Sequence, residues 1–561
     1  MSSLIGKRIG GQTYYYLREV ARVGGRPKIV SQRYLGKAGD IAAAMDGAAV
    51  LPERTQHLAF GEVAAAWSVI ERLGVAAIID EVAGSRRADA AASAGTYLAL
   101  ATLNRVVAPC SKLAFADWWA TTAADRWVKI PAAALDHRRF WDAMDLLPMP
   151  QLAEIERRIG QAMAGQFALD LSGLVLDMTN FATFIDSANE KAPIAQRGKA
   201  KQKRHDLRLV GLALVVTRDG GIPVVSRAYP GNRPDVTQFT AVIDELAARY
   251  HDLGGGAGEL TVTFDAGNDS AANQDHLTEL GLHFVGSLVV SQHPDLLAIP
   301  ASRYQPAGPD RFGGLTYHET TTQALGTARR VILTHSPTFH ARQARGFGQT
   351  LAKAERQLAG LAARLARGQT RRPRGQVEAE IAAITSPRWV SRVLQVTLTG
   401  QRPASLRLSW HIDSQARQAL EEEYFGKRIL FTDRDDWPAA EVIAAYRAQA
   451  DAETGFRQLK DRDVVSFSPM FHWTEQKIRV HVFYCVLALA IAHLMRRRAA
   501  QDGLHLSVRE LLQALAGIGE TVMIYPSTGG RPKARRMLTD RDPLQQQLFD
   551  LFGLAAHAPR A

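Results

Sequence analysis

A succession of short apolar segments between residues 173 and 290 constrains the fold of this 561-residue chain more than any other feature. These segments are rich in Val, Leu and Ile, and turn residues bound them, which is typical of buried strands. Strands are expected at residues 173–180, 208–217, 222–226, 260–264 and 283–290, and helices at 235–250 and 271–280. The order of three strands and a helix, followed by strand, helix and strand, predicts a mixed α/β sheet.

Two of these strands end in an acidic residue. Asp177 follows the apolar part of the first strand, and Asp265 follows the fourth. Functional sites in α/β sheets form at the carboxyl ends of strands. The element order and the two acids together predict a ribonuclease-H-like sheet with a site at that edge, although a single Asp at a strand end is more often a cap or turn residue.

A third acid lies on a helix expected at residues 439–460. Tyr446, Glu453 and Lys460 are each seven residues apart, so they return to nearly the same helical face. Arg457 lies one turn beyond Glu453 on that face. Taken alone, such a stripe is usually a solvated set of surface pairs.

The three acids become informative when they are considered together. The expected fold brings Asp177, Asp265 and Glu453 to one point, where carboxylates repel one another unless a cation is bound. Oxygen ligands with room for water suit Mg²⁺, with Mn²⁺ as the alternative. Two such ions activate a water or a 3′ hydroxyl and stabilise the leaving oxygen in phosphoryl transfer.

The charge of the chain indicates a polyanionic partner. The formal net charge is +12 in an otherwise ordinary composition of 46% hydrophobic and 22% charged residues, which favours nucleic acid. A membrane partner is not expected, because the longest apolar run, at 482–494, is too short to span a bilayer. The N-terminus has no signal-peptide core, and two isolated cysteines, Cys110 and Cys485, fit a reducing cytoplasm.

Two segments concentrate this positive charge. Residues 191–208 contain seven Lys or Arg residues, and residues 342–374 contain nine against one acid. The candidate DNA-backbone contacts in the first segment are Lys199, Lys201, Lys203 and Arg204. Phosphate contacts of this kind give affinity without sequence reading. A solvated loop without function would have the same composition.

The length of the chain predicts several domains. Residues 1–50 are expected to form a β-hairpin, with Gly24 and Gly25 at its turn. The further expected divisions are a helical module that could bind DNA at 51–165, the first part of the core at 166–299, an insertion with a basic helix and strands at 300–437, the second part of the core at 438–500, and a C-terminal segment at 501–561.

The acidic blocks and the helix resemble those of DDE transposases of bacterial insertion sequences, in the 1634-like group of the insertion-sequence 4 superfamily. The superfamily signature Tyr-x2-Arg-x3-Glu-x6-Lys falls on Tyr446, Gln449, Glu453 and Lys460, so the arginine position departs from the pattern. Residues 177–180 resemble the family's Asp-x-Thr block. The match extends over nearly the whole chain, and the further matching segments are 265–268, 203–208, 229–235 and 424–433.

The resemblance implies Mg²⁺-dependent cleavage of double-stranded DNA at transposon ends, followed by attack of the 3′ hydroxyl on target DNA. It implies Asp177, Asp265 and Glu453 as metal ligands, Tyr446 and Lys460 as phosphate contacts, and a homodimer that holds two ends. Arg447 and Arg457 are nearby substitutes for the missing arginine, and Arg457 is on the right face. Two alternatives stay open: a ribonuclease-H-like nuclease that does not join strands, and a domesticated copy that only binds DNA.

Overall fold

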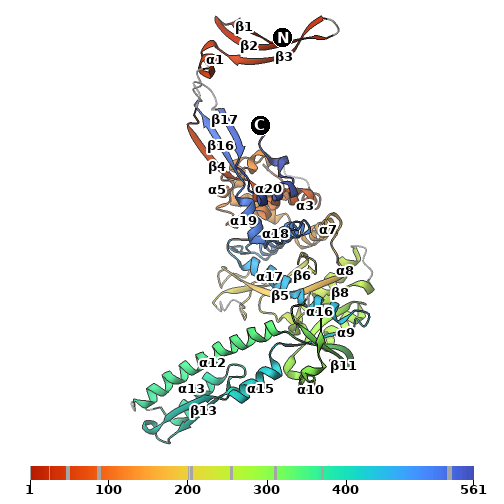
Figure 1. Cartoon of the computed structure of the whole chain (residues 1–561), viewed down its shortest axis with the longest axis vertical. Helices are drawn as coiled ribbons and strands as arrows, with labels where there is room; N and C mark the ends of the chain where they lie inside the picture. The colour runs from red at the N-terminus through yellow and green to blue at the C-terminus, as the bar shows by residue number, and fades with distance from the viewer. Residues whose placement is uncertain are drawn as a thin grey trace.

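The computed structural model describes residues 2–23, 26–45, 51–84, 90–199, 201, 206–252, 257–308, 312–367, 372–526 and 533–560. The chain is elongated (Figure 1). A small N-terminal sheet lies at one end, and an arm built around the long helix α12 (Pro337–Ala366) lies at the other. A large sheet lies between them.

The N-terminal sheet has three strands, where the sequence predicted a two-stranded hairpin. They are β1 (Ser2–Ile9), β2 (Gln12–Val23) and β3 (Arg26–Gly36), paired antiparallel in that order and followed by α1 (Ala38–Met45). The expected turn at Gly24 and Gly25 lies outside the described residues. The segment of β1 escaped prediction because Ser, Gly, Lys and Arg interrupt its apolar residues.

Residues 51–165, where the sequence predicted helices, are mainly helical and contain one further strand. The helices are α2 (Gly61–Arg72), α3 (Val75–Ala83), α4 (Ala94–Val107), α5 (Phe115–Trp119), α6 (His137–Asp145) and α7 (Met149–Phe167). The added strand is β4 (Arg54–Ala59), which pairs with β16 (Gly519–Tyr525) near the C-terminus. A second C-terminal strand, β17 (Lys533–Leu538), completes that sheet, and the helices α19 (Val508–Ala516) and α20 (Pro543–Leu551) flank it.

The large sheet has nine strands in the order β10-β11-β12-β15-β9-β8-β5-β6-β7. Their bounds are β5 (Gly173–Thr183), β6 (Arg208–Thr217), β7 (Pro223–Pro230), β8 (Thr261–Thr263), β9 (His283–Leu288), β10 (Gln305–Pro306), β11 (Thr316–Ala324), β12 (Thr327–His335) and β15 (Lys427–Thr432). β5 pairs antiparallel with β6 and parallel with β8, and β8 pairs parallel with β9, so the sheet is mixed. Four strands within the expected insertion range, β10, β11, β12 and β15, extend this sheet.

The two faces of this sheet are covered differently, as the alternation of its side chains requires. On β5, Leu174, Leu176 and Met178 pack toward α8 (Phe239–Asp252). Val175 and Phe181 pack on the opposite face, which the helices α17 (Gln449–Lys460) and α18 (Glu475–Gln501) cover. Asp177 has the same parity as Val175 and therefore belongs to the face covered by α17.

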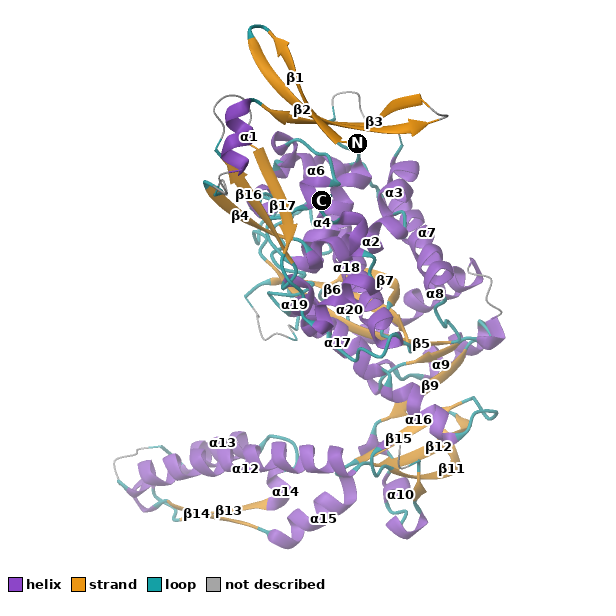
Figure 2. Ribbon diagram, turned by 45° about the horizontal axis from the view of Figure 1, so that its top comes forward, coloured by secondary structure: helices purple, strands orange, loops and turns teal. Residues whose placement is uncertain are grey.

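The remaining helices complete the core and the arm. α9 (Ala271–Glu279) packs beside β9, and the short helix α10 (Pro294–Leu297) follows that strand in the chain. α16 (Ala439–Arg447) packs on Val285, Ile332 and Leu430 of the large sheet. The arm contains α12, α13 (Arg374–Thr385), α14 (Val390–Val393), β13 (Leu394–Thr399), β14 (Arg407–Ile412) and α15 (Ser414–Tyr424). It has its own apolar core and extends from the sheet (Figure 2).

The apolar helix expected near residues 479–498 is confirmed as a core element. By length and composition α18 could cross a membrane, but 94% of its apolar window is buried inside the protein. Its histidines have structural partners: His481 bonds to the carbonyl of Phe467, and His493 bonds to that of Gly221. α18 therefore supports the face of the sheet on which the acids lie.

Candidate active site

The first acid, Asp177, lies in the middle of β5 rather than at the end of the strand. β5 continues to Thr183, and the pairing with β6 runs through Asp177 without interruption. The Asp177 side chain is partly buried, and its Oδ1 accepts a 2.7 Å hydrogen bond from the backbone N–H of Met178. The parallel neighbour β8 ends beside the first half of β5, so Asp177 lies where the edge opens.

The second acid, Asp265, follows β8 and is exposed. Its Oδ1 accepts hydrogen bonds of 3.1 Å from the backbone of Gly267 and from the side-chain amide of Asn268. This turn explains the Asp-x-Gly-Asn spacing, because it fixes the carboxylate to the end of the strand. The buried Asn268 keeps an unpartnered Oδ1 among the described atoms.

The third acid, Glu453, lies on the exposed side of α17. The single helix predicted at 439–460 is two helices, α16 and α17, which meet at Ala448. The buried side of α17 packs on β5 and β6, and Gly455 brings it close to α18, because a Cβ there would lie 3.2 Å from Leu489. This packing fixes Glu453 next to the sheet.

The three acids influence one another electrostatically. The pKa of Asp177 is raised to about 6, chiefly by burial and further by the negative charges of Asp265 and Glu453. The charge of Lys201 and the hydrogen bond from Met178 act in the opposite direction. Side chains from β5, from the turn after β8 and from α17 therefore face one region.

The donor chemistry of this region fits a hard divalent cation, because it consists of carboxylates. Within the described ranges, no group of three His, Cys, Asp or Glu residues is close enough to hold a metal ion. Shared coordination by Asp177, Asp265 and Glu453 therefore requires a closer approach than this arrangement has.

Lys460 joins α17 to the strand that carries the first acid. Its Nζ donates a 2.6 Å hydrogen bond to Oγ1 of Thr179 and lies 5.4 Å from the ring of Phe181. Burial and the charge of Lys201 lower the pKa of Lys460, whereas Asp177 raises it. Thr179 and Phe181 share the face of Asp177, so Lys460 is beside the first acid.

The loop after β5 lies against the same strand. The Nζ of Lys201 donates hydrogen bonds to the carbonyl of Met178 at 2.5 Å and to Oδ2 of Asp235 at 3.0 Å. The carbonyl of Lys199 accepts a 3.0 Å bond from Asn180, and the Lys199 side chain is exposed. The expected contacts Lys203 and Arg204 lie outside the described residues.

Tyr229 and Asp235 hold this loop in place. The sequence indicated them only through the resemblance of residues 229–235 to the transposase family. The Tyr229 hydroxyl donates a 2.7 Å bond to Asp235 Oδ1, while Asp235 Oδ2 accepts from Lys201. The ring lies against Gly211 of β6, where a Cβ would be 2.2 Å from it. The glycine therefore allows the tyrosine to reach across the sheet.

Two of the expected phosphate contacts have different surroundings. Tyr446 is 7% exposed, and its hydroxyl donates a 2.9 Å bond to Ser287 Oγ and accepts a 3.0 Å bond from Arg428. Arg457 is exposed and donates to Thr454 at 2.7 Å. DNA contact by either residue stays a prediction.

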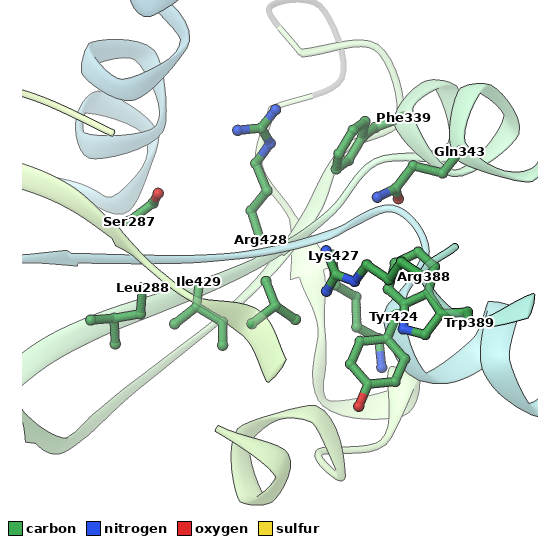
Figure 3. Close-up of a pocket in the computed structure, with 11 residues that line it drawn as sticks. Ser287, Leu288, Phe339, Gln343, Arg388, Trp389, Tyr424, Lys427, Arg428 and Ile429 are labelled. Atoms are coloured by element: carbon green, nitrogen blue, oxygen red, sulfur yellow. The ribbon is translucent and has the colours of Figure 1, made fainter. Parts of the chain in front are cut away.

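A cavity of about 740 Å³ opens between α12, β15 and the junction of α16 and α17. Tyr446, Gln449 and Glu453 lie on its wall, and so does Arg428 of β15. The sequence prediction missed Arg428, because the strand order that brings β15 beside β9 has no local signal. Arg428 also lines a neighbouring cavity of about 200 Å³ (Figure 3).

Comparison with known proteins adds a family to this geometry. A family model described as the transposase DDE domain matches residues 169–490, which is more than half of the chain. The chain belongs to the DDE transposase family. The matched range begins before β5 and ends within α18, so it includes all three acids. DDE transposases in general use divalent metal ions.

No curated protein matches this transposase. Among solved structures it is similar to the piggyBac transposase in a synaptic complex with hairpin DNA. The identity is 10% and the TM-score is 0.34, over 81% of this chain and 78% of that chain.

Proposed function

We propose that this transposase cleaves double-stranded DNA at the ends of its element and transfers the resulting 3′ hydroxyl into target DNA. The observation that carries the proposal is the arrangement of three carboxylates, from β5, from the turn after β8 and from α17, that face one region within the range matched by the transposase DDE domain. Three carboxylates that face one another in the folded chain repel one another. A cation bound between them would relieve this repulsion. The membership in the DDE transposase family supports the same reading.

The proposed ligands of Mg²⁺, or of Mn²⁺, are Asp177, Asp265 and Glu453. When bound, the ion supplies Lewis-acid chemistry for phosphoryl transfer. The hydrogen bonds to Asp265 orient its carboxylate, and the packing of Gly455 sets the position of Glu453. Each carboxylate must be ionised to hold the ion.

Lys460 and Lys201 are the proposed cations for the scissile strand. Lys460 lies on the face of β5 that carries Asp177, and the charge of Lys201 acts on both Asp177 and Lys460. A lysine ammonium can meet a phosphate oxygen as a point charge. In this arrangement Lys460 orients the phosphate next to the acids, and Lys201 holds the loop that borders it.

We also propose that the core is ribonuclease-H-like. The strand order β7-β6-β5-β8-β9 supports this, with the first three strands antiparallel and the next two added in parallel. The proposed DNA path runs along the basic loop at 191–201 and the basic side chains of α12. A homodimer that holds two element ends belongs to the same proposal.

The test is an excision assay on a plasmid that carries the DNA flanking both sides of the gene. A transposase releases the segment between paired ends and produces joined products in a target plasmid. A nuclease that cuts without joining gives breaks and no joined product, and a DNA-binding copy gives neither. Either of these results would overturn the proposal.

A further inference from the structure

The cavity beside Glu453 is strongly positive. Its charged lining residues are four arginines and one carboxylate: Arg342, Arg345, Arg428, Arg447 and Glu453. Arg342 and Arg345 come from the second and third turns of α12. A cavity with this balance favours a dianion or a phosphodiester over a neutral or cationic ligand.

Arg428 is the cation best placed in this cavity. On β15 it shares the face of Leu430, which packs against α16, whereas the preceding side chain, Lys427, points the other way (Figure 3). Its guanidinium lies 4.6 Å from the centre of the Phe339 ring and donates to the hydroxyl of Tyr446. Within the described residues it has no ion pair with a carboxylate.

Arg428 is held by its hydrogen bond to Tyr446, which lies on the same helical stripe as Gln449 and Glu453. Tyr446, Gln449 and Glu453 lie on successive helical turns across the α16–α17 junction, and all three line the cavity with Arg428. Gln449 stands where the family signature has an arginine, and it brings no charge. Arg447, the last residue of α16, also lines the cavity, and its guanidinium lies 5.5 Å from the ring of Phe312. Arg428 adds a second guanidinium, from β15, to the wall that carries Gln449.

We propose that Arg428 binds a DNA phosphate next to Glu453 and so replaces the signature arginine that Gln449 cannot supply. Arg342 and Arg345 extend this phosphate site from α12. A guanidinium suits the role because it donates two parallel hydrogen bonds to phosphate oxygens. Of the two arginines near Gln449 in the sequence, Arg457 does not line the cavity and bonds to Thr454. Arg447 lines it but lies over the ring of Phe312, whereas Arg428 is bonded to Tyr446 of the signature itself. The inference rests on the proposed function.

The test exchanges the two side chains. Arg428→Gln, Gln449→Arg and the double variant are compared for binding to a short blunt-ended DNA duplex over a series of salt concentrations. Arg428→Gln is expected to weaken binding about tenfold and to reduce the slope of log K against log salt by about one. The double variant is expected to recover both, because it returns the guanidinium to the helix.

Two controls accompany these variants. Arg407→Gln, an exposed arginine of β14 that bonds only to nearby carbonyls among the described residues, should leave the slope unchanged. Thermal unfolding of each variant identifies a loss of fold. If Arg428→Gln keeps the salt slope, or if the folded double variant does not recover it, Arg428 only packs against Tyr446 and the proposal is wrong.

The binding assay does not require cleavage, so the two proposals fail separately. A protein that binds with the expected slopes and never cuts would refute the catalytic function and leave the phosphate site standing. If the protein cuts and joins DNA and Arg428→Gln has an unaltered salt slope, the phosphate site is refuted and the catalytic function stands.

Discussion

Lys460 Nζ donates a 2.6 Å hydrogen bond to Oγ1 of Thr179, two residues beyond Asp177 on the same face of β5. This bond connects the end of α17 to the strand of the first acid. It places a cation and a carboxylate next to each other without pairing them directly. The lysine is therefore held at the site yet keeps donor capacity for a substrate phosphate.

Replacing Lys460 with alanine is expected to lower the rate of single-turnover DNA cleavage by about 100-fold, which is typical for loss of a charged donor at a reacting centre. Thr179→Val should lower it less, because the ammonium remains. Gel analysis of an end-labelled duplex measures both rates. Lys129→Ala, an exposed lysine of the helical module, is the matched control. Equal cleavage rates in Lys460→Ala and wild type would show that Lys460 takes no part in the reaction.

The stability of the metal-free protein should depend on the ionisation of Asp177. Its folded pKa of about 6 lies above the ordinary value of 3.8, so the folded state binds the proton more tightly than the unfolded state. The free energy of unfolding therefore falls as the pH rises from about 4 to about 6 and stays lower above that. Asp177→Asn should remove this loss and gain about 1 to 3 kcal/mol at pH 7.

Urea unfolding of both proteins between those pH values measures the difference. The comparison with the variant is necessary because Glu62 and Asp269, each with a pKa raised to about 7, impose a pH dependence of the same sign. Parallel curves for wild type and Asp177→Asn would show that Asp177 ionises normally.

The fully buried Arg105 of α4 is expected to stabilise the segment that follows α17. It donates from Nη1 to the carbonyls of Ser466 and Ser468, at 3.2 and 2.7 Å. Arg105→Met removes the guanidinium from the buried carbonyl of Ser466 and from the partly buried carbonyl of Ser468, and it should lower the free energy of unfolding by about 3 kcal/mol. The exposed Arg139→Met should change it by less than about 0.5 kcal/mol. A small effect at Arg105 would mean that water replaces the guanidinium.

Neutralising Lys199, Lys201 and Lys203 together should reduce the slope of log K for DNA binding against log salt by about two to three. Lys199 alone should account for about one, since its side chain is exposed. Lys201 should contribute less through phosphate contact, because it already pairs with Asp235. Fluorescence anisotropy at several salt concentrations gives the slopes. An unchanged slope in the triple variant would show that this loop is solvated and does not contact DNA.

Most of the sheet around the acids was predictable, because its strands carry strong local signals. β6 is a nearly continuous apolar run, β5 and β9 each contain a short one, and the period of two along β5 places Asp177 and Thr179 on one face. The seven-residue spacing identified Glu453 and Lys460 but not the break at Ala448, since alanine favours a continuous helix. The spacing also did not reveal that Tyr446 is buried.

The rest depends on contacts between distant segments. β4 pairs with β16 across most of the chain length, and β15 joins β9 only after the arm has intervened. No local pattern in the sequence encodes such pairings. The cavity that contains Arg428 exists only because of the second pairing, so the sequence could identify the missing arginine at Gln449 but not its substitute.

The most direct measurement of the central claim is strand transfer from a precleaved transposon end into a plasmid in the presence of Mg²⁺. Wild type should join the 3′ hydroxyl to the target. Asp177→Ala, Asp265→Ala and Glu453→Gln should each reduce joining to background while binding the DNA end with nearly unchanged affinity. Full joining by any one of the three variants would contradict the account.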